Sequence, residues 1–106
     1  MKILFDQGTP VPLRNYLDKH AVTTAYELSW QELENGALIA KAENEGFDLL
    51  VTTDQNLRYQ QNLDNRRIAI VVLKSTSWPR IKSHLDTVVS VVDQCGPGTY
   101  QEIPIP

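Results

Sequence analysis

The sequence predicts an α/β domain with a small, mainly parallel sheet, and three observations carry that prediction. Short apolar runs alternate with longer segments whose apolar residues recur at helical spacing, as in strands joined by helices. The apolar run at 48–52 is nearly unbroken, which indicates a strand buried on both faces, and 68–73 is a continuous apolar run of six residues. A composition of 42% hydrophobic and 22% charged residues over 106 positions suits one domain with a single core.

Three strands and two helices are predicted in the first half of the chain. The strands are residues 2–5, 21–25 and 48–52. Two prolines in the segment 9–20 suit the first turn of a helix, with Thr9 as its N-cap. A second helix is predicted over 29–46, because Ser29 and Glu32 have the spacing of a capping box and a glycine ends the segment.

The second half continues the alternation of helix and strand. A short helix is predicted over 55–63, the clearest strand of the chain over 68–73, and a helix capped by Ser77 over 77–94. The remaining segment, 95–106, contains several glycines and prolines and is typical of a loop or an edge strand. Residues 1–106 are therefore expected to form one domain with its core in 1–94.

Two carboxylates are expected at one edge of this sheet. Asp6 follows the first predicted strand and Asp54 follows the third. The carboxyl ends of parallel strands meet at one edge, where α/β proteins bind their ligands. Carboxylates brought together repel each other unless a cation or a shared proton neutralises them, and oxygen ligands of this kind suit Mg²⁺ or Mn²⁺. The alternative is that each aspartate only caps the helix that follows it.

The charge is distributed unevenly along the chain. The net charge is −3, but the segment 58–82 has six basic residues against one acidic residue, a local charge of +5. Such a block can attract phosphate or an acidic partner, or it can simply be a solvated face. Its best candidates for contacts to phosphate groups are Arg58, Arg66 and Arg67, together with Lys74 at the end of the strand 68–73.

Two stretches of the chain resemble a known family. "ILFDQGTP", followed by "ELENGALIAKAENEGFDLLVTTDQNL", is similar to the short, largely uncharacterised branch of the PIN-like ribonuclease superfamily. The resemblance covers residues 2–73, and its most specific part is the pairing of the first-strand aspartate with "LVTTD". It implies a three-layer α/β/α PIN-like fold and cleavage of RNA with Mg²⁺ or Mn²⁺. It also implies membership of a toxin–antitoxin pair, with an antitoxin protein as partner.

The resemblance assigns roles to individual residues. Asp6 matches the first-strand acid, Asp54 matches the acid of the Thr-x-Asp pattern, and the hydroxyl of Thr52 is expected to orient a carboxylate. Glu34 is expected to assist catalysis, and the amides of Asn35 and Asn56 are expected to complete the metal site. Both amides stand where the family commonly has acids. Because they add no charge, the affinity for the metal should be lower than that of a complete acidic cluster.

Two other functions remain open on the sequence. One is a catalytically weakened PIN-like module that binds RNA or a protein. The other is a phosphoacceptor domain resembling response-regulator receivers, with Asp54 as acceptor, Asp6 holding Mg²⁺ and Lys74 holding the phosphoryl group. Four strands are clear in the sequence, whereas receivers have five βα units, which counts against the second alternative.

The expected setting is a cytoplasmic protein without a membrane segment. No apolar run approaches the length of about 18 residues that a membrane span needs, and the start of the chain lacks the apolar stretch of a signal peptide. Cys95 is the single cysteine, so the sequence contains no internal disulfide and gives this residue no role. Assembly as a homodimer is left open.

Overall fold

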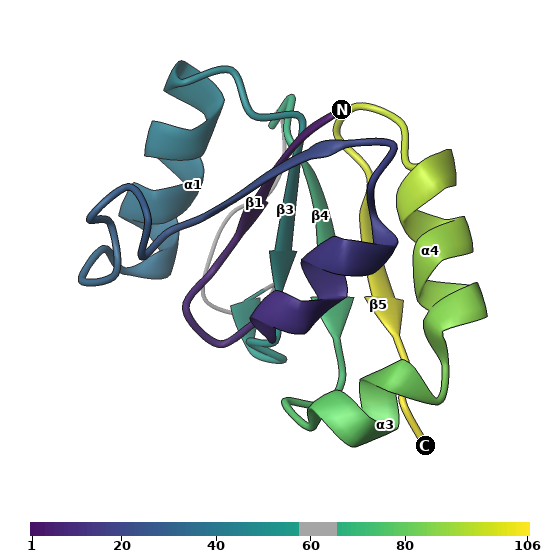
Figure 1. Cartoon of the computed structure of the whole chain (residues 1–106). Coiled ribbons are helices and arrows are strands. Elements are labelled where there is room, and N and C mark those ends of the chain that lie inside the picture. The colour runs from purple at the N-terminus through teal and green to yellow at the C-terminus, as the bar shows by residue number, and fades with distance from the viewer. Residues whose placement is uncertain (58–65) are drawn as a thin grey trace.

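The chain folds into three layers with a parallel sheet in the middle (Figure 1). A computed structural model describes residues 1–57 and 66–106. In those residues, five strands pair in parallel in the order β2-β1-β3-β4-β5. They are β1 (Lys2–Phe5), β2 (Ala21–Thr24), β3 (Leu49–Thr52), β4 (Ala69–Leu73) and β5 (Tyr100–Ile103). The predicted α/β class is therefore confirmed, and every strand pair in the described part of the sheet is parallel.

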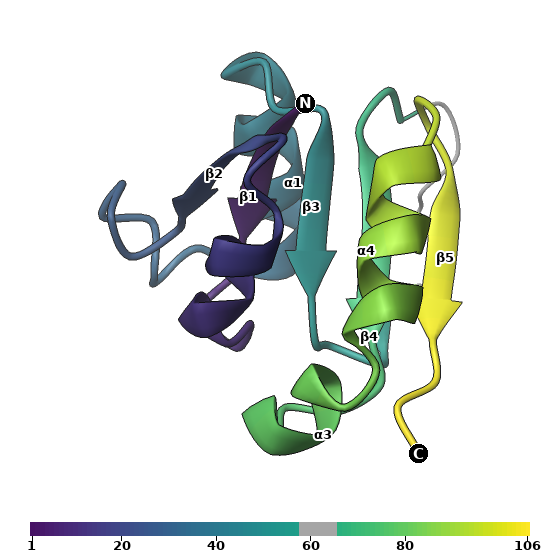
Figure 2. The same ribbon diagram turned by 45° about the vertical axis from the view of Figure 1, so that its right-hand side comes forward.

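Helices cover both faces of the sheet. They are the 3-10 helix η1 (Val11–Tyr16) and the α-helices α1 (Asn35–Asn44), α3 (Trp78–Lys82) and α4 (Leu85–Gln94). Figures 1 and 2 show α1 on one face and η1, α3 and α4 on the other. Residues 58–63 of the helix predicted over 55–63 lie outside the described residues.

The two faces of the sheet bury separate hydrophobic clusters. Phe5 and Val51 pack on the side of η1, α3 and α4, whereas Leu4 and Leu50 pack on the side of α1. Every residue of β3 and β4 is buried. This is the physical reason for the unbroken apolar runs in the sequence, since side chains of a central strand point alternately into two cores.

The first predicted helix is shorter and tighter than expected. The prediction of a helix over 9–20 is wrong in extent, because only Val11–Tyr16 are helical and their turns close from residue i to i+3. Two early prolines remove backbone donors there. Thr9 is not its N-cap, which is Pro10, and its side chain is buried at the edge of the sheet instead.

The helix predicted over 29–46 begins only at Asn35. Ser29 has a φ of 62° and closes a series of tight turns, so the capping box with Glu32 does not form. Trp30 and Leu33, in the segment before the helix, pack against the core cluster on the α1 side. The stop is confirmed, since α1 ends at Asn44 and Gly46 adopts the left-handed conformation that glycine tolerates best (φ 82°).

The helix predicted over 77–94 is two helices joined by a bend at Ser83 and His84. The hydroxyl of Ser83 donates a hydrogen bond to the carbonyl of Pro79, a contact that bends helices. Ser77 is confirmed as the N-cap, since its side chain accepts from the backbone N–H of Arg80. The segment 95–106, left open between loop and edge strand, contributes β5 at the sheet edge beside β4.

The strand order places a topological switch point between β1 and β3. The chain passes from β1 to β2 at one edge, and β3 continues to β4 on the other side of β1. In open α/β sheets the connections diverge at such a point and leave a crevice beyond the carboxyl ends of the strands, where ligands bind. Both Asp6 and Asp54 follow the strands that flank this switch point.

Candidate functional site

Asp6 and Asp54 lie beyond the carboxyl ends of two neighbouring strands. The backbone N–H of Asp6 donates to the carbonyl of Val51 (3.2 Å), which extends the β1–β3 pairing by one residue. Asp54 comes two residues after the end of β3. Both side chains are half-buried. The shared edge that the sequence predicts for these two carboxylates is therefore where the fold places them.

Thr52 connects the two aspartates. Its hydroxyl donates to Asp6 Oδ2 and accepts from the backbone N–H of Asp54 (3.1 Å). The side chain of Thr52 is buried, with 1% of its surface exposed, so the hydroxyl has little access to water and depends on these two contacts. The orienting contact expected of this threonine is present, and Asp6 is the carboxylate it holds.

A second threonine holds the other oxygen of Asp6. The hydroxyl of Thr9 lies 2.7 Å from Asp6 Oδ1 and 2.8 Å from the carbonyl oxygen of Val51, so its single hydrogen can serve either acceptor. The backbone N–H of Thr9 also donates to the carbonyl of Asp6 (3.2 Å), which closes a turn. The sequence pattern did not predict this role for Thr9. Its place three residues after Asp6 is the spacing of such a turn.

Asn35 holds Asp54 through its amide nitrogen. Nδ2 of Asn35 donates to Asp54 Oδ2, and the backbone N–H of Asn56 donates to Asp54 Oδ1 (2.9 Å). The orientation of the Asn35 amide follows from this contact, because an ionised carboxylate accepts hydrogen bonds only. Asn35 is thus brought to the site. Its amide nitrogen faces Asp54, and not the amide oxygen that could bind a metal ion. Asn56 contributes its backbone there, and its side chain is exposed.

Glu34 precedes α1 as its N-cap residue and is exposed. Its backbone carbonyl accepts from Leu38 (2.7 Å), and no side-chain cap bond forms. Within residues 1–57 and 66–106, no group of three or more acidic, histidine or cysteine side chains is arranged to hold a metal ion. The acidic part of the site therefore consists of Asp6 and Asp54.

A small cavity of about 130 Å³ lies beside Asp6 and the start of α1. Asp6 and Asn35 line it from two sides, together with Trp30 and Gln31 from the loop before α1. Oε1 of Gln31 is buried without a hydrogen-bond donor among the described residues. A buried acceptor without a partner is costly, so this oxygen is a place for an ordered water or a ligand hydroxyl.

The turn after β1 comes close to the end of β3. A Cβ at Gly8 would lie 2.6 Å from the hydroxyl oxygen of Thr53 and 3.8 Å from Asp6 Oδ1. Real Cβ contacts essentially never approach 2.6 Å, so a larger residue at this position would displace Thr53 or the turn itself. The absence of a side chain at Gly8 therefore lets the two loops meet beside Asp6.

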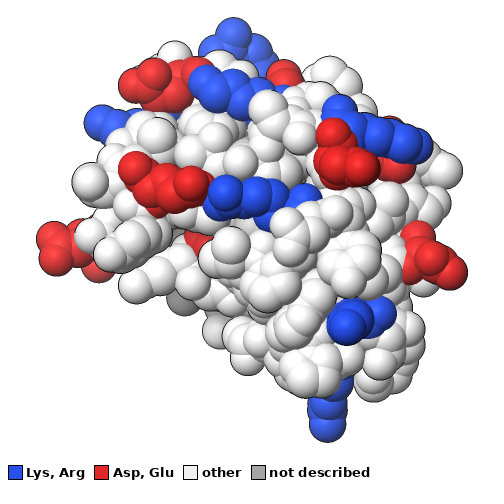
Figure 3. All heavy atoms as spheres, in the orientation of Figure 1, with Lys and Arg blue, Asp and Glu red and all other residues white. Residues whose placement is uncertain are grey.

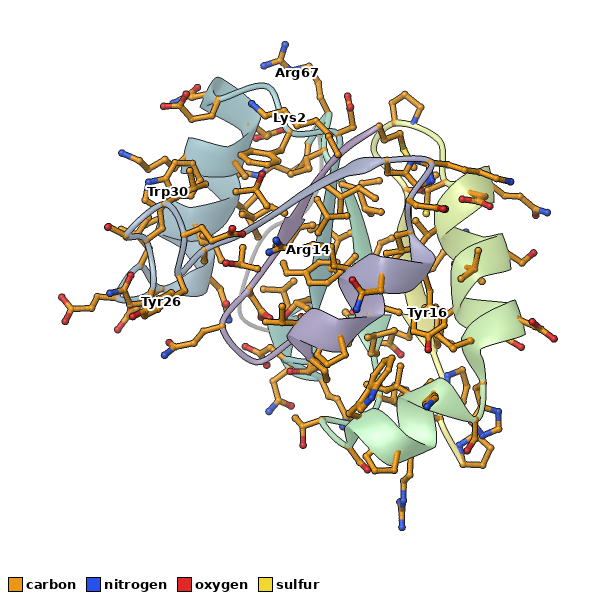
Figure 4. All side chains as sticks on the ribbon, in the orientation of Figure 1. Lys2, Arg14, Tyr16, Tyr26, Trp30 and Arg67 are labelled. Carbon is orange, nitrogen blue, oxygen red and sulfur yellow. The ribbon has the colours of Figure 1, made fainter. Side chains whose placement is uncertain are left out.

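The described residues of the basic segment 58–82 do not gather in one surface beside this site. Arg66 and Arg67 come just before β4 and so lie at the amino ends of the strands, opposite the aspartates. In Figure 4, Arg67 and Lys2 of β1 are at the same end of the molecule. Lys74, at the carboxyl end of β4, has its Nζ 4.0 Å from Glu102 Oε1. Arg58 is outside the described residues. In Figure 3 the face over η1 and α3 is mostly uncharged.

Arg66 is part of an ion pair that ties the start of β4 to α1. Its Nη1 donates to Glu43 Oε1 (2.8 Å), while the backbone N–H groups of Arg67 and Ile68 donate to Oε2. Partial burial opposes ionisation of Glu43. The Arg66 guanidinium and the two backbone donors outweigh it and hold the pKa of this carboxyl below its ordinary value. This arrangement gives Arg66 a structural partner.

Comparison with known proteins yields no match: no family model, no curated protein and no solved structure is similar to this chain. No helix in the described part of the chain is both long and apolar enough to cross a membrane.

Proposed function

We propose that the protein is a PIN-like ribonuclease that depends on Mg²⁺ or Mn²⁺ and cleaves RNA at the edge occupied by Asp6 and Asp54. The observation that carries the proposal is the coupling of these two carboxylates at the switch point through the buried hydroxyl of Thr52. Ligands of α/β sheets bind at such a point. As a toxin-type nuclease it would have an antitoxin protein as its partner.

The carboxylate oxygens of Asp6 and Asp54 are suitable ligands for a hard dication that also binds phosphates of the substrate. Each carboxylate oxygen has more than one lone pair, so the contacts to Thr9, Thr52 and Asn35 leave Asp6 and Asp54 able to bind an ion. Mg²⁺ is commonly bound by one or two carboxylates plus substrate phosphates. When bound, the ion would stabilise negative charge that develops on a phosphodiester.

The protein's own groups would position that ion. Thr52 and Thr9 each hold one oxygen of Asp6, and Asn35 together with the Asn56 backbone holds Asp54. Side chains fixed in this way lose less freedom on binding a ligand than free ones do. For Asn35 to bind the ion itself, its amide would have to turn so that the oxygen replaces the nitrogen.

The test is cleavage of a mixed single-stranded RNA pool by purified protein in EDTA, Mg²⁺ or Mn²⁺. Asp6→Asn and Asp54→Asn should each abolish cleavage, and Asp18→Asn, on an exposed turn before β2, should not. Circular dichroism of each variant checks that the fold is retained. Cleavage that survives EDTA or both site substitutions refutes the assignment, and so does inactivity in every metal.

One contact favours a second candidate, a binding module of the same fold that works without a metal. The amide nitrogen of Asn35 already occupies a position beside Asp54 where a cation would compensate charge. In that case the wild-type protein should bind RNA equally well in EDTA and in Mn²⁺ without cutting it. Binding that requires the dication would exclude this candidate.

The strand count bears on the phosphoacceptor alternative. Five parallel strands remove the objection that only four are present. Two contacts weigh against it: both oxygens of Asp54 already accept hydrogen bonds, and the ammonium of Lys74 is placed toward Glu102. Incubation with a small phosphodonor followed by intact-mass measurement decides the matter, since only this alternative expects a phosphorylated product that Asp54→Asn abolishes.

A further inference from the structure

A groove of about 320 Å³ shares Asp6 with the candidate site and extends toward η1 and the loop that follows β2. Arg14 of η1 and Glu27 of the loop line it, together with Val11 and Tyr26. Its volume is at the lower end of the range found for small-ligand sites, about 300–1,000 Å³. The groove is therefore large enough for one planar ring system and adjoins the proposed centre.

Two exposed apolar side chains flank this groove. Tyr26 is 72% exposed and Val11 is 52% exposed, and both are among the four large hydrophobic residues exposed in the described part of the chain. Figure 4 shows Tyr26 on the loop after β2 and Arg14 reaching from η1 toward the sheet. Among the described residues, the ring of Tyr26 makes no aromatic contact, so its face is open for a flat ligand to stack on.

A fixed ion pair provides polar groups in the same groove. The guanidinium of Arg14 donates to both oxygens of Glu27, with Nη1 3.4 Å from Oε2, and Thr24 N donates to Glu27 Oε1 (2.9 Å). The backbone donor of Thr24 and the Arg14 guanidinium hold the pKa of Glu27 below its ordinary value, so it accepts hydrogen bonds at neutral pH. Nε of Arg14 is buried without an acceptor among the described residues.

We propose that this groove is the subsite for a base of single-stranded RNA, which stacks on Tyr26 while its polar edge faces the Arg14–Glu27 pair. The inference rests on the proposed function for its choice of RNA. A nucleotide placed there has its backbone beside Asp6, next to the site of cleavage. Stacking tolerates any base because every base has a π-face. The groove also offers a donor, Arg14, and an acceptor, Glu27, side by side, so its polar groups suit more than one base. Base identity should therefore affect binding little.

The experiment measures binding rather than cleavage. A short fluorescein-labelled single-stranded RNA, and the same strand with abasic residues, are titrated with the full chain in Ca²⁺, and a gel verifies that the RNA stays intact. Tyr26→Ala should weaken binding of the intact strand about tenfold, as expected for loss of one base–aromatic stack. Tyr26→Phe should bind like the wild type, since it keeps the ring.

The matched control is Tyr16→Ala. Tyr16 is also an exposed tyrosine, at 42%, but it packs near Trp78 of α3 and lines a different groove. This variant should bind as the wild type does. The inference is overturned if Tyr26→Ala binds like the wild type, if Tyr26→Phe loses as much as Tyr26→Ala, or if the abasic strand binds as tightly as the intact one. Tyr26-dependent binding without cleavage in any metal would refute the nuclease and leave the base subsite standing.

Discussion

Asn35→Asp tests the site most sharply, because it should have opposite effects on stability and on metal binding. The substitution replaces an amide that donates to Asp54 with a second carboxylate. Without a metal, the protein loses a hydrogen bond to a charged group and gains a like-charge contact. With a metal, the same change completes a group of three acids. The two effects can be separated by measuring the same variant with and without the metal.

The cost without metal can be estimated from the contact. A hydrogen bond to a charged group contributes about 1.5–3 kcal/mol. Two unit charges about 4 Å apart repel by up to about 4 kcal/mol near a protein surface, and the half-buried position of both side chains allows water to reduce this. A carboxylate in the first turn of α1 recovers about 0.3–1 kcal/mol. We expect a net loss of about 2–4 kcal/mol in the free energy of unfolding.

Thermal unfolding followed by circular dichroism is the assay. In EDTA the variant should melt lower than the wild type by about 4–8 °C for each kcal/mol lost. In Mn²⁺ at about 100 times its Kd, binding to the folded state restores about 2.7 kcal/mol. The rise in melting temperature on adding Mn²⁺ should therefore be larger for the variant than for the wild type, and RNA cleavage should increase with it.

Asn44→Asp is the matched control, since it makes the same change at the exposed far end of the same helix. It should cost at most about 1 kcal/mol through the helix dipole and show no added response to Mn²⁺. If Asn35→Asp melts like the wild type in EDTA, the contact between Asn35 and Asp54 is not made. If it melts lower but gains no more from Mn²⁺ than the wild type does, the edge does not bind a dication.

Two further substitutions test contacts that hold the site and its scaffold. Thr52→Val keeps the shape of the side chain but leaves the backbone N–H of Asp54 and one oxygen of Asp6 without this hydrogen-bond partner. It should lower the free energy of unfolding by about 2–4 kcal/mol in urea melts. Thr52→Ser keeps the hydroxyl and should cost less. Glu43→Gln should cost about 2 kcal/mol at about pH 7. Because the folded state lowers the pKa of Glu43, its contribution is present above the unfolded value and disappears as the pH falls through the folded one. A Glu43→Gln deficit that persists in strong acid would contradict this ion pair.

The sequence predicts whether a segment forms a strand or a helix correctly where a single local interaction determines it. The apolar runs of β3 and β4 determine strands buried on both faces, Ser77 determines where α3 begins, and the glycine after α1 determines where that helix stops. The position of Asp6 and Asp54 at the same ends of neighbouring strands was also predictable. It needs only the rule that parallel strands end at one edge.

Helix extents were less predictable, because tertiary contacts override local propensity. Ser29 and Glu32 have the spacing of a capping box, yet burial of Trp30 and Leu33 against the core keeps the chain in turns until Asn35. Residues of the tail become β5 because β4 offers an unpaired edge. A sequence pattern records neither constraint, since both depend on residues distant along the chain.

The sequence by itself determined which groups carry chemistry, and the tertiary structure decided which of them meet. Asp6, Thr52 and Asp54 stand at strand ends, so pairing of β1 with β3 brings them together. Arg66 and Arg67 are close to Asp54 in sequence, but they precede β4 and so lie at the opposite end of the sheet. The physical reason is the parallel crossover. It carries the chain the full length of the sheet between consecutive strands, so neighbours in sequence are separated and residues distant in sequence become partners.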